Sequence, residues 1–139
     1  MPTGSEWVSQ ARSARARGDR EEARSCYAQA AAKYRQQGDA LACAHAVRHI
    51  ADVWMEETQL ARAQPLYEEA LNAYRGSYET RILDLANTVR PFALLQEAAG
   101  NREQARALWE EARVLYGSLR VEEGVAECEA HLSSLGKLG

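Results

Sequence analysis

The sequence predicts an all-α protein built from stacked helix hairpins, and three observations support this. First, one pattern of alanines and aromatic residues, spaced three and four apart, occurs three times, in residues 23–34, 63–74 and 105–116, so that its copies start 40 and 42 residues apart. A fixed period of this size is typical of repeated supersecondary units. Second, the helix formers Ala, Glu, Arg, Leu and Gln dominate the chain. Third, glycines and prolines are few and lie mostly between the periodic segments.

Start and stop signals along the chain divide it into seven predicted helices. These helices span about residues 5–17, 19–37, 39–57, 58–74, 77–99, 101–117 and 118–135. Residues that commonly cap helices stand at most of their starts, namely Asp19, Asp39, Thr58, Ser77, Asn101 and Ser118. Glycines stand at most of their ends, namely Gly18, Gly38, Gly76, Gly100, Gly117 and Gly136. Glu22 and Gln104 lie three residues after a cap and predict capping boxes.

Two prolines lie inside predicted helices. Pro65 and Pro91 each remove a backbone hydrogen bond and crowd the preceding turn. Because the apolar period runs through both positions, we expect kinks there and no breaks.

The helices are predicted to pair as hairpins with one apolar face each. The second helix of each pair carries the repeated alanines and aromatic residues on one face. The first helix carries a matching stripe: Trp7, Gln10 and Ala11, then Val47, Ile50, Ala51 and Trp54, then Val89, Phe92 and Ala93.

These residues resemble the tetratricopeptide repeat family, whose pattern reads W-x2-L-G-x2-Y and then A-x3-F-x2-A. The matching residues are Trp7, Ala23, Tyr27 and Ala30; Ile50, Ala51, Trp54, Ala63, Tyr67 and Ala70; and Phe92, Ala93, Ala105, Trp109 and Ala112. The turns Gly18-Asp19 and Gly100-Asn101 stand where the family has its Gly-Asp turn. The departures are Gln10, Ala14 and Gln96 at usually apolar positions, and Thr58-Gln59 at the middle turn.

The period of 40–42 residues is similar to that of the long tetratricopeptide variant found in kinesin light chains and many bacterial regulators. The resemblance covers about residues 5–117. It implies a right-handed α-solenoid of three hairpins, at about residues 4–38, 39–76 and 77–117. The helix at about 118–135, with one narrow apolar stripe, would cap the array. We therefore expect a single domain over residues 1–139.

Composition excludes several classes of protein. The net charge is -3 and the pI is about 5.7, so a nucleic-acid partner is not expected. Charge is uneven, because residues 1–38 hold seven basic and four acidic side chains (+3), which leaves -6 for the remainder. No apolar run is long enough for a membrane span, and the first ten residues lack the plan of a signal peptide. Cys26, Cys43 and Cys128 form no pairing pattern, which favours reduced cysteines in a cytoplasmic protein.

The polar face of the third helix is the candidate site. His45, Arg48, His49, Asp52 and Glu56 lie opposite its apolar stripe. The resemblance implies that this side of the first helix in each hairpin lines a concave groove, with Arg90 at the position of Arg48 and Asn87 at that of His45. Guanidinium groups in a row suit carboxylates, since each makes paired charged hydrogen bonds. The predicted groove residues are Arg12, Arg15, His45, Arg48, Asp52, Asn87 and Arg90.

Three other interpretations of these residues stay open or are disfavoured. The arginines could instead pair with neighbouring acids such as Asp52, Glu56 and Glu97. A clamp for chaperone tails, which the family builds with Lys and Asn, is not expected, because Val8 and His49 stand at those positions. His45, His49 and Asp52 share one face, but a single helix rarely completes a metal site, so no metal is predicted.

Other candidates for chemistry have structural explanations. Trp7, Trp54 and Trp109 coincide with repeat core positions. A Cys128–His131 nucleophile is disfavoured, and no phosphate-binding glycine loop is present, so no cofactor is expected. The sequence therefore predicts no enzyme but a module that binds a peptide or protein segment, with an acidic segment as the candidate. The alternatives are a self-associating repeat domain and, less favoured, an enzyme that uses the His45 face.

Overall fold

A computed structural model describes residues 1–138, and the described residues form seven α-helices and no strand. The helices are α1 (Gly4–Ala16), α2 (Arg20–Gln36), α3 (Ala40–Glu56), α4 (Leu60–Arg75), α5 (Ile82–Ala98), α6 (Arg102–Ser118) and α7 (Glu122–Leu138). The predicted all-α class and the seven helices are confirmed for this part of the chain.

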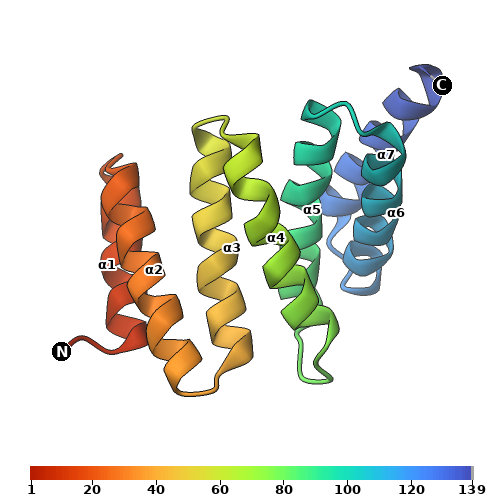
Figure 1. Ribbon diagram of the computed structural model, residues 1–139. Helices are drawn as coiled ribbons and strands as arrows, with labels where there is room; N and C mark the ends of the chain where they lie inside the picture. The colour runs from red at the N-terminus through yellow and green to blue at the C-terminus, as the bar shows by residue number, and fades with distance from the viewer. Residues whose placement is uncertain (139) are drawn as a thin grey trace. The chain divides into compact units, whose positions relative to one another are not determined.

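The helices fall into two compact units. Unit 1 is Met1–Ser77 with α1 to α4, and unit 2 is Tyr78–Gly139 with α5 to α7. In unit 1, α1 packs on α2, α2 on α3 and α3 on α4; in unit 2, α5 packs on α6 and α6 on α7. Figure 1 shows these neighbours running antiparallel within each unit. Packing of each helix on the next in sequence is the arrangement of an α-solenoid.

The repeated alanine and aromatic positions form the core. Nearly all of them are buried, namely Ala23, Tyr27, Ala30, Ala63, Tyr67, Ala70, Tyr74, Ala105, Trp109, Ala112 and Tyr116. Small alanines let neighbouring helices approach, and the aromatic rings fill the space that remains. Tyr34 is the exception: it is half-buried, and its ring lies over Gly4, where a Cβ atom would come within 2.7 Å of it.

Five of the six connections between helices close in the same way. In each, a backbone N–H donates to a carbonyl five residues earlier; the first three are Asp19 to Ala14, Asp39 to Tyr34 and Gln59 to Trp54, and the last two are Asn101 to Gln96 and Val121 to Tyr116. The residue before each donor has a positive φ, and these residues are Gly18, Gly38, Thr58, Gly100 and Arg120. Gly18, Gly38 and Gly100 are thus confirmed as helix-ending glycines, because glycine adopts this conformation without steric cost. Gly76 also ends its helix as predicted, at the C-cap of α4, whereas Gly136 does not, because α7 continues to Leu138.

The shared turn explains three wrong predictions. Thr58 does not cap α4: it takes the left-handed position with a φ of 55°, and Gln59 stands at the N-cap. Likewise Gly117 does not end α6 and Ser118 does not open α7, because α6 continues through Ser118 and Arg120 supplies the left-handed residue.

The connection from α4 to α5 differs from the other five. Ser77 was predicted to open α5, but that helix begins at Ile82 after a non-helical segment over 76–81. Tyr78 in this segment is fully exposed, so it contributes no packing that would hold another helical turn.

The predicted caps are confirmed in part. Asp19 and Asp39 each accept a backbone N–H at 3.1 Å. Thr3 and Glu6 form a full capping box at α1, which the sequence analysis missed. Asn101 does not cap α6 with its side chain, since its amide donates to Gln96 instead, at 2.7 Å. The capping box predicted with Gln104 is therefore wrong.

Both prolines lie inside unbroken helices, as expected: α4 continues through Pro65 and α5 through Pro91. The apolar stripe of α7 is buried at Cys128 and Leu135. Among the described residues, no helix has the length and apolar character needed to cross a membrane.

Candidate functional site

The polar face of α3 in unit 1 gathers four of the predicted groove residues. We define the α3 cluster as Arg15, His45, Arg48, His49, Asp52 and Tyr67. Spacings of three and four place the α3 members on one side of that helix. Arg15 reaches them from α1, and Tyr67 reaches them from α4.

Asp52 is held from two sides. The hydroxyl of Tyr67 donates to Asp52 Oδ1 at 2.5 Å, and Arg48 Nη1 donates to Oδ2 at 3.5 Å. Burial raises the pKa of Asp52 above its ordinary value, while Arg48 and Tyr67 oppose this. Burial also raises the pKa of Tyr67, so the phenol keeps its proton and stays a donor. The hydrogen bond from Tyr67 therefore holds the Asp52 carboxylate beside the Arg48 guanidinium.

His49 is a neutral link in a chain of hydrogen bonds. Arg15 can only donate, so His49 Nδ1 accepts from Arg15 Nη1, at 3.4 Å. His49 Nε2 then carries the proton and donates to His45 Nε2 at 3.2 Å. The ring of Tyr27 stacks on His49, with centroids 5.1 Å apart. Burial first, and then the charges of Arg48, His45, Arg15 and Arg12, lower the pKa of His49 to about 2.

The arginines around this cluster also meet glutamates. Arg15 Nη2 lies 2.6 Å from Glu56 Oε1, and Arg20 Nε lies 3.2 Å from Glu56 Oε2. Arg24 pairs with Glu57 and lies over the ring of Trp54, 3.7 Å from its centroid. Arg12 is exposed and forms no ion pair with a described residue. The open alternative of ion pairing thus holds for Arg48 with Asp52 and for Arg15 with Glu56.

The other two predicted groove residues lie in unit 2 and have partners there. Asn87 Oδ1 accepts from the hydroxyl of Tyr116 at 2.7 Å. Arg90 donates twice to Glu127, with Nε 2.5 Å from Oε1 and Nη2 2.9 Å from Oε2. These hydrogen bonds lower the pKa of Glu127. Arg90 therefore meets an acidic partner only in competition with Glu127.

Glu97 does not pair with an arginine but links three elements of unit 2. Its Oε1 accepts from Trp109 Nε1 at 2.5 Å and lies 2.8 Å from His131 Nδ1. The His131 ring stacks on Trp109, with centroids 4.1 Å apart. This contact joins α5, α6 and α7.

Two tyrosines have polar roles that were not predicted from the sequence. Tyr67 and Tyr116 were predicted to lie in the core by their repeat positions, and both rings are buried. A buried phenol hydroxyl needs a partner, so each one signalled a polar residue on the preceding helix. Those residues are Asp52 and Asn87.

The two histidines of the α3 cluster and Asp52 do not converge on one point. The Nε2 atoms of His45 and His49 face each other, whereas Asp52 Oδ2 lies 3.9 Å from the other nitrogen of His49. The described residues hold no group of three potential metal ligands close enough to bind an ion. The Cys128 thiol is fully buried, which raises its pKa to about 11 and disfavours a nucleophile.

Comparison with solved structures identifies the fold. The chain is similar to the crystal structure of BtubC (BKLC) from P. vanneervenii, with a TM-score of 0.83 and 16% sequence identity. The alignment covers 96% of this chain and 55% of that one, so this chain spans little more than half its length. No protein-family model and no curated protein matches the sequence. At this identity the likeness concerns the fold alone, and the chain has the fold of a helical repeat protein.

Proposed function

We propose that the chain is a protein-interaction module that binds an acidic segment of a partner protein. The helical repeat fold supports a scaffold role, because such folds present extended surfaces. The residues predicted from the sequence remain the proposed binding residues: Arg12, Arg15, His45, Arg48 and Asp52 in unit 1, and Asn87 and Arg90 in unit 2. We assign the module no catalysis, and the buried, free cysteines favour a reducing compartment such as the cytoplasm.

The observation that carries the proposal is an excess of positive charge at and around the α3 cluster. Arg15 and Arg48 belong to the cluster, Arg12 and Arg20 lie near it, and the acids among them are Asp52 and Glu56. The difference is two positive charges. His49 adds none, because it is neutral. A partner carboxylate would gain charged hydrogen bonds from guanidinium N–H groups that the two acids do not fill.

The proposal is tested by selecting peptides from a displayed random library on the full chain. We expect selected peptides to be rich in Asp and Glu. Their affinities are then compared for wild type, Arg12→Glu and Arg48→Gln by fluorescence polarisation. Arg12 is exposed, so its reversal leaves the fold intact; we expect a loss of affinity of roughly three- to tenfold. Glutamine at 48 avoids a second carboxylate beside Asp52.

Arg113→Glu is the matched control, because it reverses an exposed arginine on α6 in unit 2. It should bind acidic peptides as wild type does, and circular dichroism should show that all variants are folded. Selection of basic peptides, or equal affinities for wild type, Arg12→Glu and Arg48→Gln, would contradict the proposal. If no peptide is selected and light scattering shows a mass that rises with concentration, self-association replaces it.

A further inference from the structure

Unit 2 contains an open depression where the first turns of α5 and α7 meet the end of α6. We call it the Tyr116 depression. It measures about 500 Å³. Its lining combines Leu83, Tyr116, Val121 and Gly124 with the polar residues Asn87, Arg90, Glu123 and Glu127. This volume lies in the range of sites that hold a small ligand or a few side chains.

The apolar part of the lining is firmly placed. The Tyr116 ring is fixed by its hydrogen bond to Asn87 and by the close approach of Gly124. Leu83 is 46% exposed, and Val121 is half-buried beside it. An apolar side chain placed here would remove exposed aliphatic surface from water, which is favourable in proportion to the area covered.

The charged residues that line the depression are acidic in balance. The Arg90 guanidinium is matched by Glu127 through two hydrogen bonds, so these two charges cancel. Glu123 is exposed and forms no ion pair with a described residue, which leaves one negative charge. Unit 2 as a whole holds seven basic and ten acidic side chains, a net charge of -3, whereas unit 1 holds ten of each and is neutral. The surroundings therefore attract a cation.

We propose that the Tyr116 depression binds an apolar side chain of the partner segment that is followed or preceded by Lys or Arg, with the cation at Glu123. This inference rests on the proposed function and specifies the partner further. The partner segment would then carry an apolar residue next to a basic one in addition to its acidic residues. A uniformly acidic segment would not fit the depression.

The test uses capped dipeptides as probes, so it does not depend on finding the partner. The full chain is labelled with ¹⁵N and titrated with N-acetyl-leucyl-lysine amide, N-acetyl-leucyl-glutamate amide and N-acetyl-alanyl-lysine amide. We expect the leucyl-lysine probe to shift the backbone amide signals of Val121 and Gly124. The leucyl-glutamate probe should bind roughly two- to fivefold more weakly, as expected for one exposed charge at a rim. The alanyl-lysine probe should bind more weakly than leucyl-lysine, because it covers less apolar surface.

Glu123→Gln and Glu129→Gln separate the site from general charge. Both remove one exposed carboxylate from α7, and only position 123 lines the depression. Glu123→Gln should abolish the preference for lysine over glutamate, and Glu129→Gln should preserve it. The inference is overturned if the three probes leave the Val121 and Gly124 signals unmoved. It is also overturned if lysine and glutamate probes bind wild type equally, or if the two variants behave alike. These results do not depend on the peptide selection. If the selection fails, it contradicts the proposed binding of an acidic segment at the α3 cluster and not the binding at the Tyr116 depression.

Discussion

Gly124 sets how closely α7 approaches α6. A Cβ atom at this position would lie 2.6–2.9 Å from three atoms of the Tyr116 ring, closer than side chains tolerate. Tyr116 has little freedom to withdraw, because the ring is buried and its hydroxyl donates to Asn87. The absence of a side chain at 124 is therefore part of the packing of α7 on α6.

Gly124→Ala should lower the free energy of unfolding by about 1–3 kcal/mol, the usual cost of forcing extra atoms into a packed contact. Urea denaturation measures the change. Gly136→Ala on the same helix is the control, since a Cβ atom there meets no atom within 4 Å. That variant should be unchanged or up to about 1 kcal/mol more stable, because alanine favours the helix. Equal stability of the two variants would show that the Tyr116 contact imposes no constraint.

His49 couples stability to pH. An unfolded histidine has a pKa of about 6.5, and burial lowers the pKa of His49 in the folded chain to about 2. Between these values the unfolded chain binds a proton at His49 and the folded chain does not. The contribution of neutral His49 to the free energy of unfolding is therefore fully present above pH 6.5. It decreases as the pH falls toward 2, by at most about 1.4 kcal/mol per pH unit.

The neighbours of His49 determine how this is measured. It faces Arg15 from α1 and Tyr27 from α2, with His45, Arg48 and Asp52 on α3. Asp52 acts in the opposite sense, because its raised pKa makes the folded chain bind a proton more readily. The comparison is therefore between wild type and His49→Gln, by urea denaturation from pH 7 to pH 5. The wild type should lose more stability over this interval, and parallel curves would contradict a buried neutral His49.

At the scale of the elements, two of the shared turns contain a residue in an unfavourable backbone conformation. The shared turn needs one residue with positive φ, and Thr58 and Arg120 occupy that position with φ of 55° and 57°. The left-handed conformation costs an L-residue roughly 1–2 kcal/mol, and a branched side chain such as that of threonine suits it poorly. Three of the five turns use glycine at the same position.

Thr58→Gly should raise the free energy of unfolding by about 1 kcal/mol or less, because relief of the strained φ outweighs the added freedom of glycine in the unfolded chain. Thermal unfolding followed by circular dichroism measures it. Gly100→Ala is the reciprocal variant, with a φ of 86° and open space around the site. It should be less stable than wild type. A loss of stability in Thr58→Gly would show that Thr58 makes interactions that outweigh its conformation.

The helices, the turns and the contacts of the candidate site differ in how well they can be predicted from the sequence. The order of the helices and the buried alanine and aromatic positions follow from periodicity, which reflects which face meets a neighbour. The turns at Thr58 and Arg120 were missed, because the left-handed residue there is not the glycine that signals such a turn. The contacts of the candidate site were predicted least well. Arg90 and Glu127 are 37 residues apart, and they meet because α5 and α7 both pack on α6.

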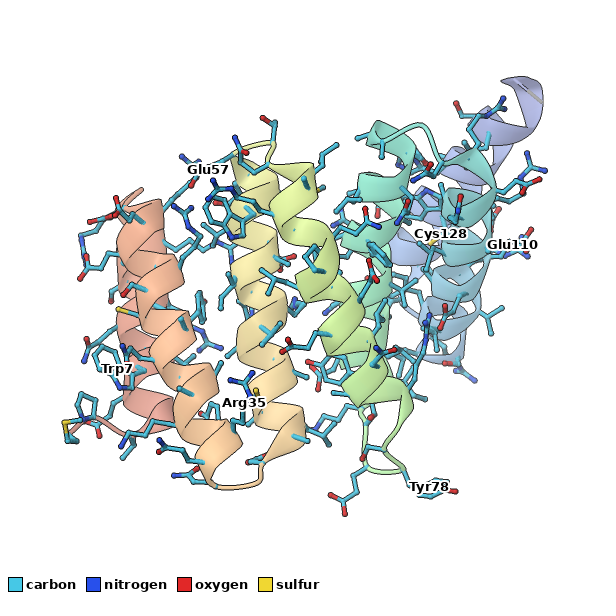
Figure 2. All side chains as sticks on the ribbon, viewed as in Figure 1. Trp7, Arg35, Glu57, Tyr78, Glu110 and Cys128 are labelled. Carbon is cyan, nitrogen blue, oxygen red and sulfur yellow. The ribbon has the colours of Figure 1, made fainter. Side chains whose placement is uncertain are left out.

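At the scale of the whole molecule, one segment stands apart from the repeating turns. Residues 76–81 connect the two units without helix, and Tyr78 within them is fully exposed. Figure 2 shows the Tyr78 side chain pointing away from the helices. Proteases cleave exposed, extended segments first, whereas a bond in a helix has to open locally before cleavage.

Chymotrypsin, which cleaves after aromatic residues, should therefore make its first cut after Tyr78. Most other aromatic side chains of the chain are buried in helices, including Tyr27, Tyr67, Tyr74, Trp109 and Tyr116. An opening free energy of only about 1.4 kcal/mol slows cleavage at such a bond about tenfold. Mass spectrometry at early times should show fragments 1–78 and 79–139. Tyr78→Ser should delay the first cut by about that factor, while Leu119→Ser, at another exposed turn, should not. A first cut inside α2 or α6 would contradict this prediction. It would mean that bonds in a helix become accessible to the protease sooner than those of residues 76–81.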